Sequence, residues 1–148
     1  MSGGDTPLAW AAGRGHLEVV EILLGRSDIN PDKPNNHGLT PLWCAIGNGY
    51  EGVVKALLQR RDVNPNTRAL NGLTPLHWAA WNGYEGVVEI LLGRRDINPN
   101  GLSGDGKTPL WYASTAGHEE VVKILLGRGG VNPSEPDNRG KTRFRWCC

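Results

Sequence analysis

The sequence predicts an all-α solenoid, a stack of helix-turn-helix units joined by loops. A constant step of 34 residues separates the Gly-x-Thr tripeptides, which start at Gly4, Gly38, Gly72, Gly106 and Gly140. Within each step, helix-start and helix-stop residues bracket two short segments, and the second has apolar residues at helical spacing. Helices this short cannot bury their apolar faces within one unit, so neighbouring units must stack.

The repeat divides the chain into four full units and a partial fifth, within a single domain of residues 1–148. The units are residues 4–37, 38–71, 72–105, 106–139 and 140–148. An isolated array needs terminal units with polar outer faces. Because this chain opens almost on its first Thr-Pro and stops inside the first helix of a fifth unit, we expect it to be a segment of a longer array.

The first helix of each unit is expected to begin after a threonine. A Thr hydroxyl can accept a backbone N–H at the helix start, and the Pro that follows suits the first helical position. These threonines are Thr6, Thr40, Thr74 and Thr108. The same helix should end at a glycine, which adopts the left-handed conformation without a Cβ penalty. These glycines are Gly15, Gly49, Gly83 and Gly117.

The second helix of each unit carries one apolar stripe. In the third unit the stripe consists of Val87, Val88, Leu91 and Leu92. Glu85 begins this helix, and Arg94 and Arg95 end it, so these charges oppose the helix dipole. We therefore interpret the Arg pair as a helix-end feature rather than an anion site. Asn98-Pro99 then breaks the helix, and polar residues 100–105 form an exposed finger.

The pattern G-x-TPL-x-x-A followed by G-[HY]-x-x-VV-x-x-LL recurs four times in register and closely resembles the ankyrin repeat. The resemblance covers nearly all of the chain. It implies an ankyrin-repeat solenoid with β-hairpin-like finger loops. It also implies a protein-protein interaction scaffold or recognition module, of the kind found in the repeat region of larger signalling proteins. The family usually ends its second helix with Gly-Ala, whereas this chain has Arg-Arg, Arg-Ser or Arg-Gly.

The resemblance further implies that a protein partner docks on the concave side, formed by finger tips and exposed first-helix residues. The four units differ most at these places. We expect the protein-binding residues to be Asp5, Arg14, Leu39, Asn48, Leu73, Trp78, Trp81, Asn82, Lys107, Tyr112 and Thr115. Trp81 is the strongest candidate, because other units have Gly or Thr at its position and packing does not require it. Trp78 has two open interpretations, packing between repeats or contact with the partner.

His77 stands beside two tryptophans, which raises the question of a catalytic site. The other units have Ala9, Trp43 and Trp111 at its position, so the position does not require an imidazole. In ankyrin-like units such a histidine bonds Thr or backbone between repeats. No nucleophile, base and orienting group recur together, so we expect no catalytic residues and no enzyme. His16 and His118 alternate with Tyr50 and Tyr84 after the first-helix glycine, and we interpret these four residues as inter-helix packers.

The segment DINPNG at residues 96–101 matches the first half of an EF-hand loop. The twelfth position of such a loop should be a bidentate Glu, but Lys107 stands there. We therefore expect no metal and no cofactor, and we interpret Asp96 and Asn98 as turn-forming residues. In related ankyrin proteins the matching asparagines can be hydroxylated. The candidates for this modification are Asn30, Asn64, Asn98 and Asn132.

Composition bounds the partners. Lys plus Arg total 16 against 15 Asp plus Glu, so a net charge of +1 indicates no nucleic-acid or membrane partner. Three cysteines at unsuitable positions form no disulfide framework, and no signal peptide is visible. We expect a monomeric intracellular protein, in the cytoplasm or nucleus.

The last two cysteines suggest an alternative function. Cys147 and Cys148 follow Lys141, Arg143 and Arg145, a composition that could direct lipidation and produce a membrane-tethered adaptor. The segment TRFRWCC also aligns with TPLAWAA at residues 6–12. That alignment favours the interpretation of both cysteines as replacements for small core alanines.

Overall fold

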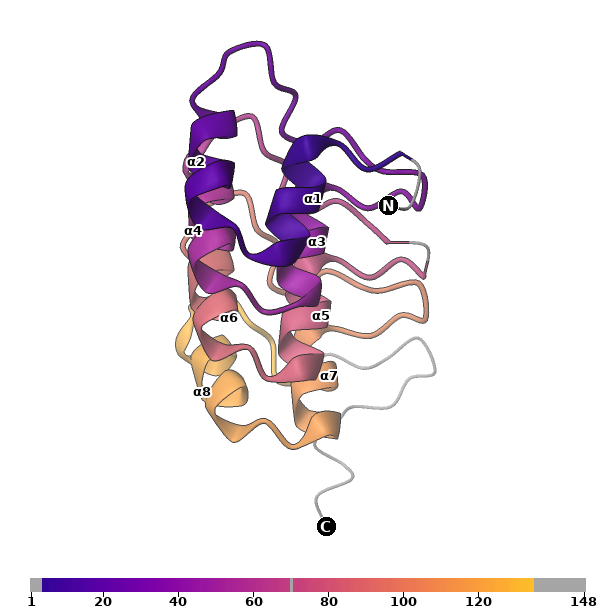
Figure 1. Ribbon diagram of the computed structural model, residues 1–148. Helices are drawn as coiled ribbons and strands as arrows, with labels where there is room; N and C mark the ends of the chain where they lie inside the picture. The colour runs from indigo at the N-terminus through magenta and orange to yellow at the C-terminus, as the bar shows by residue number, and fades with distance from the viewer. Residues whose placement is uncertain (1–3, 70, 135–148) are drawn as a thin grey trace.

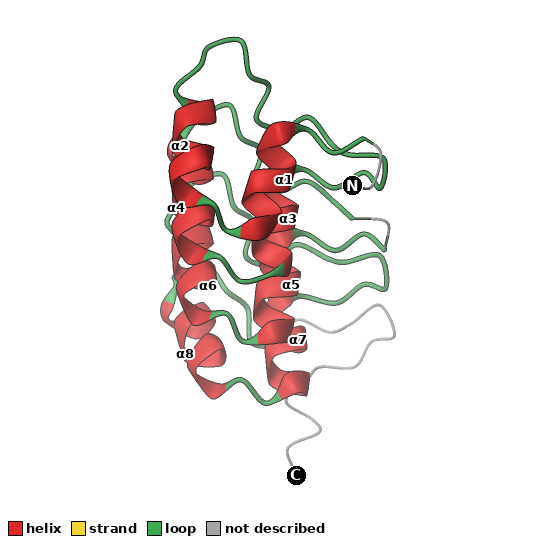
Figure 2. Ribbon diagram, in the orientation of Figure 1, coloured by secondary structure: helices red, strands yellow, loops and turns green. Residues whose placement is uncertain are grey.

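The computed structural model describes residues 4–69 and 71–134 as eight helices in two parallel rows (Figure 1). The helices are α1 (Pro7–Arg14), α2 (Leu17–Leu24), α3 (Pro41–Gly47), α4 (Glu51–Gln59), α5 (Pro75–Asn82), α6 (Glu85–Leu92), α7 (Pro109–Ala116) and α8 (Glu119–Gly127). The first helices of the units form one row and the second helices the other. Figure 2 shows loops, and no strand, between the helices of this described part. The expected all-α solenoid is confirmed.

The first helices begin where the sequence predicts. In α1 the hydroxyl of Thr6 accepts from the backbone N–H of Ala9 at 3.1 Å, and Pro7 occupies the first turn. Thr40 and Thr108 cap α3 and α7 in the same way. Three of these helices also end at the expected glycine. In the second unit the helix stops at Gly47, and the positive φ falls at Gly49, two residues further.

The glycine after a first helix has a positive φ, and in the first three units a side chain of the next unit also lies close to it. Gly83 has φ +71°, which favours glycine, and a Cβ there would lie 2.6 Å from the His118 ring of the next unit. Tyr50 and Tyr84 approach Gly15 and Gly49 in the same way. We expected these aromatic residues to pack between helices, and here Tyr50, Tyr84 and His118 each contact the first helix of the preceding unit.

The core lies between the two rows and runs through the stack. In α6 the residues Val87, Val88 and Leu91 are fully buried and Leu92 is nearly so, as the apolar stripe predicts. Helix α6 contacts both α4 and α8, and α5 contacts both α3 and α7. Each unit therefore depends on its neighbours to cover its apolar faces, as expected for a solenoid.

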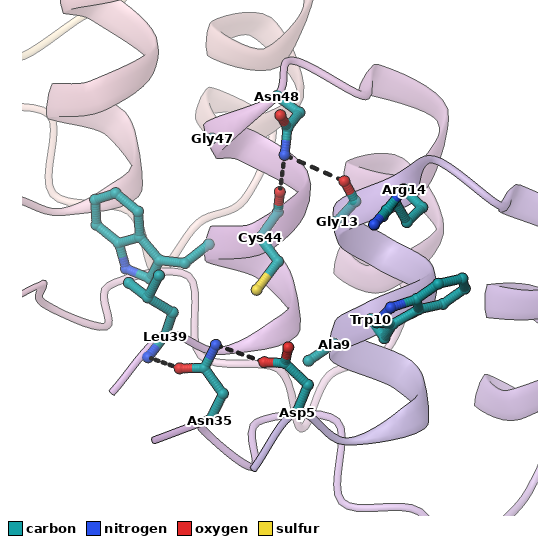
Figure 3. A pocket seen from close by; sticks show the side chains of 11 residues that line it. Asp5, Ala9, Trp10, Gly13, Arg14, Asn35, Leu39, Cys44, Gly47 and Asn48 are labelled. Carbon is teal, nitrogen blue, oxygen red and sulfur yellow. Dashed lines mark hydrogen bonds between the residues drawn. The ribbon is translucent and has the colours of Figure 1, made fainter. Parts of the chain in front are cut away.

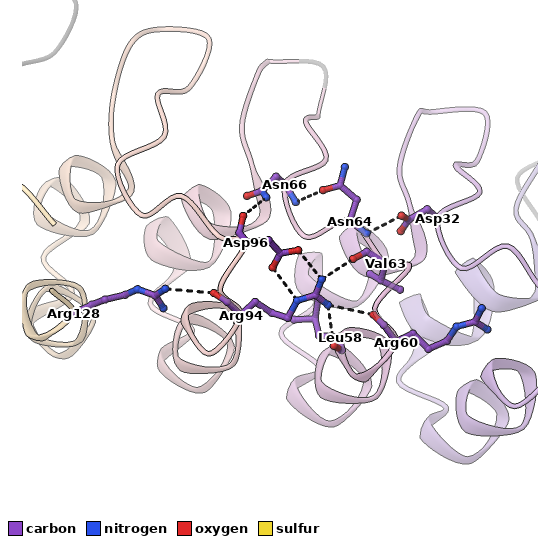
Figure 4. A network of polar contacts seen from close by, with 9 residues as sticks. All are labelled: Asp32, Leu58, Arg60, Val63, Asn64, Asn66, Arg94, Asp96 and Arg128. Atoms are coloured by element: carbon purple, nitrogen blue, oxygen red, sulfur yellow. Dashed lines mark hydrogen bonds and ion pairs between the residues drawn. The ribbon is translucent and has the colours of Figure 1, made fainter. Parts of the chain in front are cut away.

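The arginines after the second helices have a different role from the one that the sequence suggests. Helix α6 ends at Leu92, and its last turn holds no basic residue. Arg94 instead reaches back to the end of α4 in the preceding unit, where Nη1 donates to the carbonyl oxygens of Leu58 at 3.0 Å and Arg60 at 3.2 Å (Figure 4). Arg94 therefore caps α4 of the preceding unit and not its own helix α6.

The fingers are closed by backbone hydrogen bonds rather than by regular strands. In the third finger Ser103 N–H donates to the carbonyl of Lys107 and Gly106 N–H donates to that of Ser103, both at 2.9 Å. Gly106 has φ +76° at this turn. Asparagines join successive fingers, since Asn66 Nδ2 donates to the carbonyl of Asp96 at 2.7 Å. The loops are thus hairpin-like, as the resemblance implied.

Some expectations fall outside the described residues. They are the partial fifth unit at residues 140–148 and the modification of Cys147 and Cys148. Within the described part, none of the helices has both the length and the apolar character needed to cross a membrane.

Candidate protein-binding face

The fingers project from the row of first helices, and together they form one side of the molecule, which we call the finger face (Figure 1). It consists of the exposed parts of α1, α3, α5 and α7 and of the fingers beside them. This is the side expected to be the concave binding surface. Two grooves lie on it, and both are bordered by residues of more than one unit.

Groove 1 lies between the first and second units and has a volume of about 430 Å³. Four of the expected binding residues line it, namely Asp5, Arg14, Leu39 and Asn48. Asp5 lies at one end of the groove, and Arg14 and Asn48 lie at the other (Figure 3). The groove therefore presents a negative and a positive group at opposite ends.

Asn35 organises one end of groove 1, although the sequence analysis did not select it. Its Nδ2 donates to Asp5 at 2.8 Å, and its Oδ1 accepts from the backbone N–H groups of His37 and Leu39, both at 3.0 Å. The corresponding residues of the next units are Ala69 and Ser103, so this position varies as the selected positions do. Variation between units could have identified Asn35.

Aromatic and sulfur groups line the rest of groove 1. The guanidinium of Arg14 lies 5.3 Å from the centre of the Trp10 ring, a cation–π distance. Burial, and to a smaller extent the nearby carboxylate of Asp5, raise the pKa of Cys44 to about 11. Cys44 is therefore a thiol at neutral pH, and it contributes contact surface rather than a nucleophile.

Groove 2 lies between the second and third units and has a volume of about 380 Å³. Its walls are mainly apolar, with Trp43, Leu73 and Trp78 as the largest side chains. Leu73 is only 9% exposed, so this expected binding residue offers little surface of its own. Leu39, Trp43 and Gly47 border both grooves. The two grooves therefore share one wall and run across three successive units.

The two tryptophans of groove 2 differ in their polar atoms. Trp43 Nε1 donates to the carbonyl of Thr67 at 2.9 Å. Trp78 Nε1 is buried without a partner, and its ring meets Trp43 edge to face at a centroid distance of 6.4 Å. Trp78 also packs against the core. Trp78 therefore packs between units and also lines the groove, so contact with a partner stays a prediction.

Trp81 lies further along the finger face and is 44% exposed. Its ring meets Tyr112 edge to face at 5.7 Å, and the Tyr112 hydroxyl donates to Asp105 at 2.9 Å. Partial burial raises the pKa of that carboxyl, but hydrogen bonds from Ser103, Lys107 and Tyr112 outweigh it and lower the pKa to about 2. Trp81 thus stands against a neighbour that is itself anchored, which reduces the freedom of its ring.

The other expected binding residues also have intramolecular partners. Lys107 Nζ lies 2.9 Å from Asp105 and 3.9 Å from the centre of the Trp111 ring. Asn82 Nδ2 donates to the carbonyl of Trp78 at 2.9 Å, and Thr115 Oγ1 donates to that of Trp111 at 2.8 Å. Asn48 likewise binds backbone carbonyls, at the edge of groove 1. These polar groups hold the surface in place around the aromatic residues.

His77 is fully buried, and both ring nitrogens have partners. Nε2 lies 2.9 Å from the carbonyl oxygen of Gly101 and 3.0 Å from that of Lys107, and it carries the proton because carbonyls only accept. Nδ1 accepts from the backbone N–H of Thr74 at 3.2 Å and lies 2.7 Å from its hydroxyl. Burial lowers the pKa of this imidazole. His77 therefore joins the third unit to the fourth, as its structural interpretation predicts.

The segment that resembles half of an EF-hand loop, residues 96–101, uses its Asp and Asn side chains to bind nearby residues. Asp96 binds Arg94, and Asn98 Oδ1 accepts from the backbone N–H of Asn100 at 3.0 Å. No group of three or more His, Cys, Asp or Glu residues is placed to hold a metal ion within residues 4–69 and 71–134. The hydroxylation candidates all form the same turn, in which Oδ1 accepts from the backbone N–H two residues on. They are Asn30, Asn64, Asn98 and Asn132.

Two comparisons with known proteins bear on this chain. A family model described as ankyrin repeats (3 copies) matches residues 2–69 and 61–137. A search of curated proteins finds no match. The two matched segments together contain both grooves, Trp81 and all four helix pairs of the described structure.

Proposed function

The chain belongs to the ankyrin repeat family, and we propose that it binds a protein partner through the finger face. Ankyrin repeats are generally protein-protein interaction modules, so the class of function follows from the family. The choice of face is supported by one observation above all. Grooves 1 and 2 share the wall formed by Leu39, Trp43 and Gly47, so they offer a recess that crosses three units.

A recess of this kind suits an extended segment of the partner. Its walls are mainly apolar, with aromatic rings held by neighbouring groups, and such rigid aromatic surfaces commonly dominate binding energy. Trp81 extends the same face beyond groove 2. The other units have Gly13, Gly47 and Thr115 at this position, so the stack does not require an aromatic ring there. We therefore assign Trp81 as an anchor for the partner in addition to the recess formed by grooves 1 and 2.

Enzymatic activity is not part of this proposal. The family consists typically of non-enzymatic scaffolds. His77 uses both ring nitrogens in hydrogen bonds within the protein, and Cys44 has a raised pKa, so neither supports acid-base or nucleophilic chemistry. The net charge of +1 supports a protein rather than a nucleic acid as partner. The free thiol of Cys44 is consistent with an intracellular location.

The chain offers a matched pair of substitutions to test the face. Gly47 borders both grooves, and a Cβ added there would meet nothing within 4 Å. Gly127 also ends a helix and has open space around it, but it lies at the end of α8 in the other row. Gly47→Arg should fill the recess, whereas Gly127→Arg adds the same charge and bulk elsewhere.

Proteins captured from cell extract by the wild-type chain and by Gly127→Arg, but lost with Gly47→Arg, would support the proposal. Quantitative mass spectrometry of the three captures makes the comparison. Equal capture by all three chains would contradict a role for the grooves. Hydroxylation of Asn30, Asn64, Asn98 and Asn132 stays a separate proposal, for which peptide mass spectrometry of the native protein is the measurement.

A further inference from the structure

An acidic residue stands at a place in the repeat where the next two units have asparagine. Asp32 lies in the loop between α2 and α3, which we call the first finger. The residues 34 and 68 positions later are Asn66 in the second finger, between α4 and α5, and Asn100 in the third. An amide side chain both accepts and donates hydrogen bonds, whereas a carboxylate only accepts them. Asp32 in its ionised form therefore cannot make every hydrogen bond that its two equivalents make.

In the later units this amide connects one finger to the next. Nδ2 of Asn66 donates to the carbonyl oxygen of Asp96 at 2.7 Å (Figure 4), and Nδ2 of Asn100 donates to that of Gly130 at 2.6 Å. Both acceptors lie 30 residues beyond the asparagine, in the loop that follows the second helix of the next unit. Oδ1 of Asn100 adds a second hydrogen bond, because it accepts from the backbone N–H of Asn132 at 3.2 Å.

Asp32 makes only the accepting half of this contact. Its Oδ2 accepts from the backbone N–H of Asn64 at 2.7 Å, as Oδ1 of Asn100 does one contact further along the stack. Its Oδ1 takes the place of the amide nitrogen and is buried without a hydrogen-bond partner. The equivalent carbonyl, 30 residues beyond Asp32, is that of Asp62. Two acceptors thus share a contact that needs one donor, and a buried acceptor without a donor lowers stability.

The groups around Asp32 act on its carboxyl in opposite directions. Burial has the largest effect and raises the pKa of this carboxyl. The backbone N–H of Asn64 lowers the pKa, the carboxylate of Asp62 raises it, and the guanidinium of Arg94 lowers it. Asp62 is itself paired with Arg60 at 2.6 Å, which reduces its charge effect. The balance raises the pKa and favours the neutral form of Asp32.

We propose that Asp32 is a proton-controlled latch between the first and second fingers. As a neutral carboxylic acid it donates from Oδ1 to the carbonyl oxygen of Asp62, which reproduces the amide contact of the later units. As a carboxylate it has no donor for that carbonyl, and only the hydrogen bond from Asn64 remains. Uptake of one proton therefore closes the latch, and loss of the proton opens it.

The two fingers that the latch joins also line groove 2. His37 and Leu39 come from the first finger, and Ala69, Asn71 and Leu73 come from the second. A closed latch holds these two walls at one separation, and an open latch lets the separation change. The consequence for partner binding rests on the proposed function, whereas the latch itself does not.

Urea unfolding at a series of pH values tests the latch. Because the folded chain holds this proton more tightly than the unfolded chain, the stabilisation is fully present below the ordinary pKa of 3.8 and is lost as the pH rises through the raised pKa of the folded state. Asp32→Asn supplies an N–H donor at every pH. At pH 7 its folding equilibrium constant should exceed that of the wild type about tenfold, and this ratio should fall steadily as the pH is lowered toward 4.

Two further substitutions serve as control and reciprocal test. Asp28→Asn removes the same charge four residues earlier, from a carboxyl whose pKa is lowered by its hydrogen bonds from Arg26, so it should not stabilise the chain at pH 7. Asn66→Asp places a carboxylate against the carbonyl of Asp96. It should lower the folding equilibrium constant about tenfold at pH 7, and part of this loss should be recovered as the pH falls toward 4.

NMR spectroscopy measures the effect on groove 2 separately. Nε1–H of Trp43 donates to the carbonyl of Thr67 in the second finger, so its signal reports on this wall of the groove. In the wild type the Trp43 signal should shift over the same pH range as the carboxyl carbon of Asp32, and Asp32→Asn should abolish that shift. The measurement needs no partner, so its failure is distinct from failure of the proposed function.

Three results would overturn the proposal. The first is a carboxyl carbon of Asp32 that titrates at or below pH 3.8, which would mean that Arg94 keeps the group ionised. The second is Asp32→Asn that is no more stable at pH 7 than the wild type or Asp28→Asn. The third is a Trp43 signal that does not follow Asp32, which would remove the effect on groove 2. Equal capture in the Gly47→Arg comparison would instead contradict the proposed function and leave the latch between the fingers intact.

Discussion

Arg94 and Asp96 form a two-point pair in which Nε donates to Oδ1 at 2.9 Å and Nη2 donates to Oδ2 at 2.7 Å. The pair holds the guanidinium against the preceding unit, where it also binds the carbonyl oxygens of Leu58, Arg60 and Val63. One side chain thus ties two units together through backbone acceptors at the end of a helix.

The first prediction concerns the hydrogen bonds from Arg94 to the preceding unit. Arg94→Gln should lower the free energy of unfolding by about 2 kcal/mol, because hydrogen bonds from a charged donor to the carbonyls of the neighbouring unit are lost. The ion pair itself contributes less, since the Asp96 side chain is 50% exposed. Urea unfolding measures the change. Arg95→Gln removes an exposed arginine one residue away and should change stability by less than about 0.5 kcal/mol; equal losses in both variants would contradict the assigned role.

Trp81 and Leu91 should separate binding from folding. Trp81→Ala should weaken partner binding by about 2 kcal/mol or more with little loss of stability, because the ring is 44% exposed. Leu91→Ala leaves a cavity in the core and should cost about 2 to 5 kcal/mol of folding free energy. Thermal unfolding of both variants, with affinity measured on a captured partner, makes the comparison. If Trp81→Ala unfolds as readily as Leu91→Ala, the tryptophan is a core residue and not an anchor.

Two glycines with the same backbone conformation should respond differently to alanine. Gly117 has φ +78° with nothing within 4 Å of an added Cβ, so Gly117→Ala should cost only the left-handed strain of about 1 to 2 kcal/mol. Gly83 has φ +71°, and its Cβ would also meet the His118 ring at 2.6 Å. Gly83→Ala should therefore cost more, as measured by chemical unfolding.

A double substitution identifies the cause of that extra cost. In a His118→Ala background the clash is absent, so Gly83→Ala should cost no more than Gly117→Ala does in the wild type. A cost that stays unchanged by removal of the imidazole would exclude the contact between the two units as the reason.

His77 should make stability depend on pH. Burial lowers the pKa of the native imidazole below its ordinary value of 6.5, so the unfolded chain takes up a proton there that the folded chain does not. The free energy of unfolding should therefore fall as pH drops below 6.5, with a slope of at most about 1.4 kcal/mol per pH unit for this one group. His77→Gln should lose that part of the slope in denaturant unfolding measured between pH 5 and 8. A variant whose slope equals that of the wild type would show that other groups cause it.

The residues that line the two grooves were only partly predictable. Variation between units directed attention to the finger face, and four of the selected residues line groove 1. The same criterion selected Leu73, which is buried, and omitted Asn35, which organises the groove. Exposure and alignment within one repeat do not show which side chains of neighbouring units meet. That information depends on the offset between units, which no single unit contains.

Residues close together in the chain are enough to define most of the helices. Thr caps, Pro at the first turn and Gly at positive φ act within a few residues, so the helix boundaries and the 34-residue period could be predicted from local rules. Which carbonyl oxygens Arg94 and His77 bind follows from the way the units stack. Arg94 binds a carbonyl 36 residues away and His77 one 30 residues away. Such contacts form only when stacking brings backbone acceptors of one unit against side chains of the next, because a hydrogen bond requires a separation of about 3 Å that local sequence does not set.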